Sequence, residues 1–159
     1  MTGDGPRCDD CGGPGGAEWC AALFGELLTL DYSRREPWGP LHAVSVACYH
    51  FQHPSRAVSG SGPFYWSLLH FYLREGRDPL IAVTQRARRY NTHRTGGRKP
   101  GPDDFPGAPP FPSPAAPPAV YDTTIADVAV GGDFPAEGFE DRVRSWATAT
   151  LSAWAATGP

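Results

Sequence analysis

The chain has 159 residues, a formal net charge of −3 and 19% charged residues, which suits one domain with its own core. This charge balance gives no general case for a protein that binds nucleic acid or a membrane surface. No apolar run approaches the roughly 20 residues of a membrane span, and the N-terminus lacks the basic and apolar parts of a signal peptide. We therefore expect a cytoplasmic protein, and its 19 glycines and 18 prolines indicate irregular segments.

Residues 1–17 are rich in glycine and contain a CxxCG sequence made of Cys8, Cys11 and Gly12. This sequence is typical of zinc knuckles, in which the small residue lets backbone amides approach the thiolate sulfurs. Redox motifs share the CxxC spacing, but they usually open a helix after a strand. The two aspartates between the thiols would also raise the thiol pKa values, so we favour metal binding over redox chemistry.

The next part of the chain predicts a hairpin of two helices. Apolar residues at helical spacing predict the first helix over 18–31, and residues 32–39 break the pattern as a connector. The second helix is predicted over 41–53, because Pro40 is a good starting residue and Pro54 forbids continuation. A short connector makes two such helices antiparallel neighbours.

The register of this hairpin predicts two pairs of polar residues at opposite ends. Cys20 and His53 lie at the outer end, whereas Asp31 and His42 lie near the connector. The two ends are about 16 Å apart at about 1.5 Å per residue, so His42 and His53 cannot bind the same ion.

The sequence therefore predicts one zinc site formed by Cys8, Cys11, Cys20 and His53. Three thiolates and one imidazole suit tetrahedral Zn²⁺, and a set of four protein ligands is typical of a structural site. His50 is the alternative fourth ligand, since residues three apart on a helix are neighbours. We interpret Cys48 as a buried core thiol.

This order of residues resembles the uncharacterised bacterial domain-of-unknown-function family 5946. The likeness covers most of the chain and is strongest over residues 8–54, while 124–128 and the Trp-bearing helix after it resemble the C-terminal part of the family. The family pattern has a histidine after the phenylalanine and a His-His pair, where this chain has Gly25 and Ala43. The resemblance implies a family but no activity. The matching residues are Cys8, Cys11, Gly12, Cys20, Phe24, Asp31, His42, Tyr49, Gln52, His53 and Pro54.

Two further helices are predicted over 63–75 and 78–90, with Asp78 as the N-cap of the second. Aromatic residues on nearly every side of 63–75 indicate a central core helix, and a ligand pocket lined by them is the alternative. We interpret His70 as a core or rim histidine.

Residues 74–99, which begin at Arg74 and end at Lys99, carry eight basic and two acidic residues. We interpret these basic residues either as a solvated helix face or as a patch that binds phosphate, a carboxylate or RNA.

Residues 92–120 are rich in Pro and Gly and predict an extended connector that Phe105 and Phe111 hold to the body. Thr124 and Asp127 form a capping box for a short helix ending at Gly131, and residues 135–156 predict a last helix. The predicted fold is all-α: a small bundle of about four to five helices with an N-terminal knuckle and a Pro-rich connector. As one domain, 1–159, it comprises the knuckle (1–17), the helical core (18–91), the connector (92–120) and the C-terminal helices (121–159).

Three functions fit these patterns. The first is a zinc protein with a structural metal, acting as a module that binds a small molecule or a protein partner. The second is a small zinc-dependent enzyme with an open metal position, in which His42, Asp31, Tyr49 and Gln52 are the candidate catalytic residues. The third is an RNA-associated protein that uses residues 74–99.

Overall fold

The computed structural model describes residues 5–91 and 101–158, without the side chains of 88–91, and the described residues are all-α. They form six α-helices and, within these ranges, no strand. The helices are α1 (Gly16–Tyr32), α2 (His42–Gln52), α3 (Gly62–Glu75), α4 (Arg77–Asn91), α5 (Ile125–Val128) and α6 (Phe139–Ala155), with 3₁₀ turns η1 (Gly39–Leu41), η2 (Pro54–Arg56) and η3 (Pro102–Asp104).

The helices agree with the predicted segments, except at some ends. The predicted short helix stops at Val128, because Ala129 adopts an extended conformation. The last helix starts at Phe139, four residues late, because Gly138 before it is left-handed with φ 71°. Asp78 lies in the first turn of α4 and does not cap it, because the helix already begins at Arg77.

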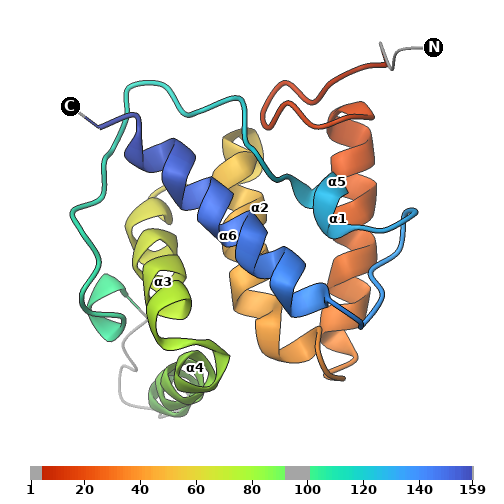
Figure 1. Ribbon diagram of the computed structural model, residues 1–159. Helices are drawn as coiled ribbons and strands as arrows, with labels where there is room; N and C mark the ends of the chain where they lie inside the picture. Colours follow the sequence, from red (N-terminus) through yellow and green to blue (C-terminus); the bar gives the residue numbers. More distant parts are fainter. Residues whose placement is uncertain (1–4, 92–100, 159) are drawn as a thin grey trace.

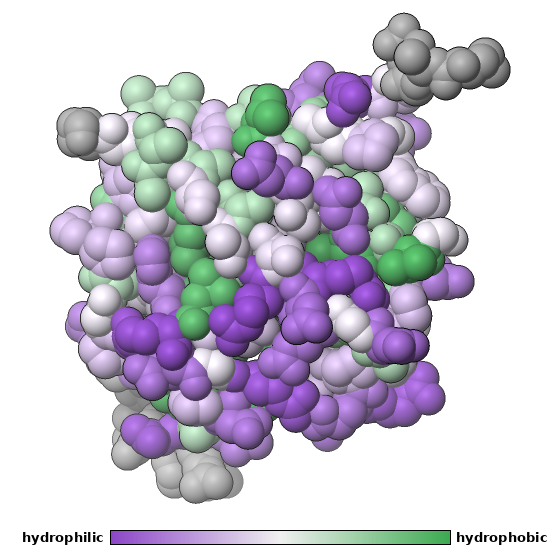
Figure 2. All heavy atoms as spheres, in the orientation of Figure 1, coloured by the Kyte–Doolittle hydropathy of each residue, from purple (hydrophilic) through white to green (hydrophobic). Residues whose placement is uncertain are grey.

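α2 lies at the centre of the bundle and packs against α3 on one side and α6 on another. Figure 1 shows α6 running diagonally across α2, with its C-terminal end near the upper end of α3, α1 beside α2 and α4 below α3. The buried residues of α6 repeat at helical spacing and include Phe139, Val143, Trp146 and Thr150, which form the face that packs on the bundle. On the side of the molecule where α6 lies, hydrophilic residues cover much of the lower half (Figure 2).

The Pro-rich connector is anchored by the two predicted phenylalanines. Phe105 is buried against Phe64 and Phe71 of α3, with ring centroids 5.8 and 5.4 Å apart. Phe111 stacks on Trp154 of α6 at 5.9 Å. The connector rises along one edge of the bundle and crosses over to α5 (Figure 1). It thereby links the side of α3 to the end of α1.

The capping box predicted before α5 is present, since the backbone N–H of Thr124 donates to the Asp127 carboxylate at 2.8 Å. This fixes the start of α5 beside α1, which it contacts. Within the two described ranges, no helix has the length and apolarity needed to cross a membrane.

Candidate metal centre

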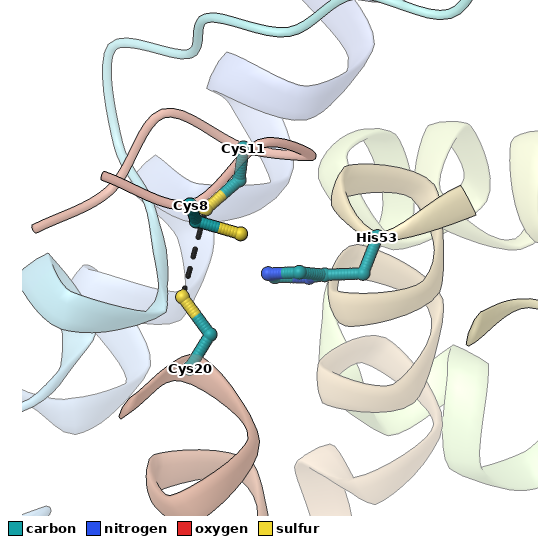
Figure 3. A group of neighbouring side chains, drawn as sticks. All are labelled: Cys8, Cys11, Cys20 and His53. Atoms are coloured by element: carbon teal, nitrogen blue, oxygen red, sulfur yellow. Dashed lines mark hydrogen bonds between the residues drawn. The ribbon is translucent and has the colours of Figure 1, made fainter. Parts of the chain in front are cut away.

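Three separate segments bring four donor side chains together at one end of the α1–α2 hairpin. Cys8 and Cys11 come from the knuckle, Cys20 from the first half of α1, and His53 from the residue that follows α2. Their donor atoms all lie within 4.8 Å of one another, and all four residues are buried. Figure 3 shows the three thiols and the imidazole directed toward one common point.

The knuckle is shaped by backbone hydrogen bonds around its glycines. The Cys8 N–H donates to the Gly13 carbonyl at 2.9 Å, and the Gly12 N–H donates to the Cys8 carbonyl at 2.8 Å. The Gly13 N–H lies 3.3 Å from the Cys11 sulfur, the amide-to-sulfur contact that the CxxCG sequence predicts. Gly12 has φ 76°, and a Cβ there would stand 3.0 Å from the Ala119 carbonyl oxygen. A residue without a side chain is therefore needed at this position.

His53 is held in the tautomer that a metal ligand requires. Its Nδ1–H donates to the Tyr49 carbonyl at 2.8 Å, so the lone pair of the neutral ring is on Nε2. Nε2 is buried and has no hydrogen-bond partner among the described residues. The Tyr49 ring stacks on the imidazole at 4.1 Å, and Phe24 stacks on Tyr49 at 3.8 Å. An orphaned nitrogen facing three thiols is the environment that a bound cation would satisfy.

The sulfur spacing also fits a tetrahedral ion. The sulfurs of Cys11 and Cys20 lie 3.7 Å apart. Two sulfurs bound to one zinc at about 2.3 Å with a tetrahedral angle lie about 3.8 Å apart. All four cysteines are free, so this contact is not a disulfide. The residues present therefore fit Zn²⁺.

The thiols influence one another strongly. The pKa of Cys8 is raised chiefly by burial, and that of Cys20 chiefly by its hydrogen bond to Cys11. The same contact, seen from Cys11, lowers the pKa of Cys11. Without a cation, one thiolate therefore makes it unfavourable for its neighbours to ionise. A divalent ion removes this penalty, because it stabilises several thiolates at once.

The other cysteine and the alternative histidine lie outside this group of donors. His50 has its Nδ1 3.3 Å from the Tyr65 hydroxyl, and burial lowers the pKa of His50. Cys48 is fully buried in the core, where burial raises the pKa of its thiol. Its position agrees with the interpretation of Cys48 as a core residue.

Asp31 and His42 form the second pair that the hairpin register predicts. Nδ1 of His42 lies 3.0 Å from Oδ2 of Asp31. Burial raises the pKa of Asp31, against the opposing effect of the His42 hydrogen bond. Eleven helical residues separate each member of this pair from the metal cluster, a distance of about 16 Å. The pair is therefore too far away to act on a ligand of the metal.

The remaining candidate catalytic residues have structural contacts. Gln52 donates from Nε2 to the Thr123 carbonyl and to the Thr150 hydroxyl, both at 2.9 Å, and so joins α2 to α6. Tyr49 is buried between Phe24 and His53, and burial raises the pKa of its phenol. The structure thus does not gather the four candidates into one active site.

Two contacts of the cluster were not anticipated from the sequence. One is the Tyr49 carbonyl, which accepts the hydrogen bond from His53. A signal for it existed, because the last carbonyls of a helix lack partners and His53 follows Tyr49 by four residues. The other is the hydrogen bond from the Ser55 hydroxyl to the Asp10 carboxylate, which ties the knuckle to η2. No local pattern indicates that contact.

The fold and the cluster define a small helical protein with a Cys₃His group that could hold a metal ion. A family model matches residues 6–155, and the chain belongs to that family, described as a family of unknown function (DUF5946). No curated protein and no solved structure matches the chain.

Proposed function

We propose that this protein is a zinc-stabilised module that binds a small ligand. In this proposal Cys8, Cys11, Cys20 and His53 hold one Zn²⁺ whose role is structural. The main support for this proposal is that four buried donor atoms from three chain segments lie within 4.8 Å of one another. Because free cysteines are typical of a reducing compartment, we also propose a cytoplasmic location.

A structural role for the metal is supported by the number and setting of the ligands. Four protein donors complete a tetrahedron, whereas a catalytic zinc keeps a position for water or substrate. The cluster is buried, and it joins the knuckle to both helices of the hairpin. Removing the ion would release these three segments from one another, so metal binding and folding should be coupled.

The two other functions considered from the sequence have less support. An enzyme that combined the metal with His42 and Asp31 would need these groups near the ion, and they are about 16 Å away. The basic stretch 74–99 lies in part outside the described residues, including 92–100. Within its described part, Arg77 pairs with Glu36 at 2.8 Å and Arg74 pairs with Glu75 at 2.9 Å. These pairs reduce the positive charge available to RNA.

Metal content tests the structural-zinc part of the proposal directly. We expect one zinc per chain by elemental analysis, and X-ray absorption showing three sulfurs, one nitrogen and no oxygen in its first coordination sphere. A Cys8→Ser/Cys11→Ser double variant should lose the zinc and melt roughly 10 °C lower or more. Cys48→Ser is the matched control, because it removes a buried thiol outside the cluster and should keep the zinc.

Two results would count against this function. Full zinc retention in the double variant would exclude the site. A first sphere of two sulfurs, one nitrogen and one oxygen would show an open position and favour the enzyme.

A further inference from the structure

A pocket of about 730 Å³ lies at the opposite end of the hairpin from the metal cluster. Its walls come from the C-terminal end of α1, the N-terminal end of α2, and the facing sides of α3 and α4. This volume is in the range of about 300–1,000 Å³ that holds small organic ligands. The metal cluster contributes no residue to the lining, so the pocket is a separate site.

Most of the wall is apolar and belongs to distant parts of the chain. The apolar side chains come from α2, α3, α4 and the connector, and they include Val46, Phe64, Leu68, Ile81 and Phe105. Such a wall favours the aliphatic or aromatic body of a ligand. The aromatic helix α3 therefore contributes both to the core and to a pocket, the two alternatives that its sequence raised.

The polar lining residues include the Asp31–His42 pair and Arg34 from the hairpin, and Thr84 and Gln85 from α4. Asp31 is fully buried behind His42, and its second carboxylate oxygen has no hydrogen-bond partner among the described residues. His42 keeps 32% of its side chain exposed, and among the described residues only its Nδ1 has a hydrogen-bond partner, Asp31. Its Nε2 is thus the nitrogen left to meet a ligand.

Arg34 supplies a positive charge to the pocket lining. It lines the pocket, its side chain is exposed, and it forms no ion pair among the described residues. The carboxylate of the nearby Glu36 accepts two 2.8 Å hydrogen bonds from Arg77. The backbone of Arg34 is left-handed, with φ 61°, and a Cβ on Gly39 would stand 2.8 Å from its Cα. A tight turn therefore fixes the direction of the Cα–Cβ bond of Arg34.

We propose that this pocket binds a small carboxylate with an apolar body, its head group paired with Arg34 and His42. A guanidinium binds a carboxylate with two parallel hydrogen bonds, and an imidazole nitrogen beside it adds a third donor when protonated. The lining combines the positive charge of Arg34, which forms no ion pair among the described residues, with apolar side chains such as Val46 and Leu68, and these match the head group and the body of such a ligand. This inference rests on the proposed ligand-binding role and names its ligand class.

Calorimetry on the full, zinc-loaded chain with decanoate and with decanol tests this inference. Both ligands have the same apolar chain, and only decanoate has the charged head group. We expect Arg34→Gln to weaken decanoate binding by at least about tenfold and to change decanol binding by less than about twofold. Arg35→Gln is the matched control, because Arg35 is the neighbouring exposed arginine and does not line the pocket.

A second variant tests the apolar wall. Val46→Trp places a large ring in the pocket and should abolish binding of both ligands while the zinc content stays at one per chain. Absence of decanoate binding to the parent protein, or equal affinity in the parent and Arg34→Gln, would overturn the inference. Such a result with zinc still bound would contradict the carboxylate-binding pocket but not the structural zinc site, so the experiment distinguishes the two.

Discussion

His53 follows the last residue of α2 and contributes the nitrogen ligand of the metal cluster. It is the first residue after α2, so its own ring can turn back and donate to the Tyr49 carbonyl in the last turn of that helix. This single hydrogen bond sets the tautomer and leaves Nε2 free for the ion. Pro54 next to it ends the helix, and this places the ring at the cluster instead of on a further helical turn.

A buried carboxyl gives a prediction that depends on pH. Burial raises the pKa of Asp31, so the folded chain holds this proton more tightly than the unfolded chain does. The contribution of Asp31 to stability is therefore fully present below pH 3.8, its unfolded value, and is lost as pH rises through the folded value. Asp31→Asn does not titrate. We expect the stability of this variant relative to the parent to increase as the pH rises above 3.8.

Chemical denaturation of both proteins at a series of pH values measures this difference. Effects of acid on the metal cluster occur in both proteins and cancel in the comparison. A difference that stays constant with pH, or that shifts toward the parent at higher pH, would contradict a raised pKa for Asp31.

At the scale of elements, the knuckle and the hairpin depend on each other. The knuckle has no extended hydrophobic core of its own and is held by its two thiols, by the Ser55–Asp10 hydrogen bond and by contact with residue 119. The hairpin in turn places Cys20 and His53 at the same end because its two helices are antiparallel. The metal cluster thus forms where a loop meets the end of a helix pair.

Two glycine substitutions with opposite expected effects test this dependence. Gly12→Ala puts a side chain at φ 76° and 3.0 Å from the Ala119 carbonyl oxygen, so it should destabilise the protein by about 1–3 kcal/mol. Gly25→Ala is the control, because Gly25 lies within α1 with nothing near its Cβ position. It should stabilise the protein by roughly 0.5–1 kcal/mol. Urea unfolding measures both, and equal effects would show that the knuckle does not constrain the fold.

At the scale of the whole molecule, the Pro-rich connector joins distant helices. Phe111 lies among Phe51 of α2, Trp66 of α3 and Trp154 of α6. The Trp66 indole N–H also donates to the Pro109 carbonyl at 2.7 Å. An extended chain with few hydrogen bonds of its own is thus held in place by aromatic contacts.

Removing one of these contacts should therefore weaken the whole fold. We expect Phe111→Ala to lower the free energy of unfolding by about 2–4 kcal/mol, because it leaves a cavity among three aromatic rings. Val120→Ala is a suitable control, since Val120 is 79% exposed and should change stability by less than about 0.5 kcal/mol. Both values come from urea denaturation. Similar values for the two variants would mean that the connector does not stabilise the bundle.

The sequence by itself determined the helices, the knuckle and the pairing of Cys20 with His53 and of Asp31 with His42. These features follow from apolar periodicity, from the positions of Pro and Gly, and from the rise per residue of two antiparallel helices. Only the tertiary structure decided that Gln52 bonds Thr123 and Thr150, that Tyr49 stacks on Phe24 and His53, and that Arg34, His42 and the side of α3 share one pocket. Those contacts join residues far apart in the chain, and they depend on how α3, α4 and the connector pack against the hairpin, which no local pattern records.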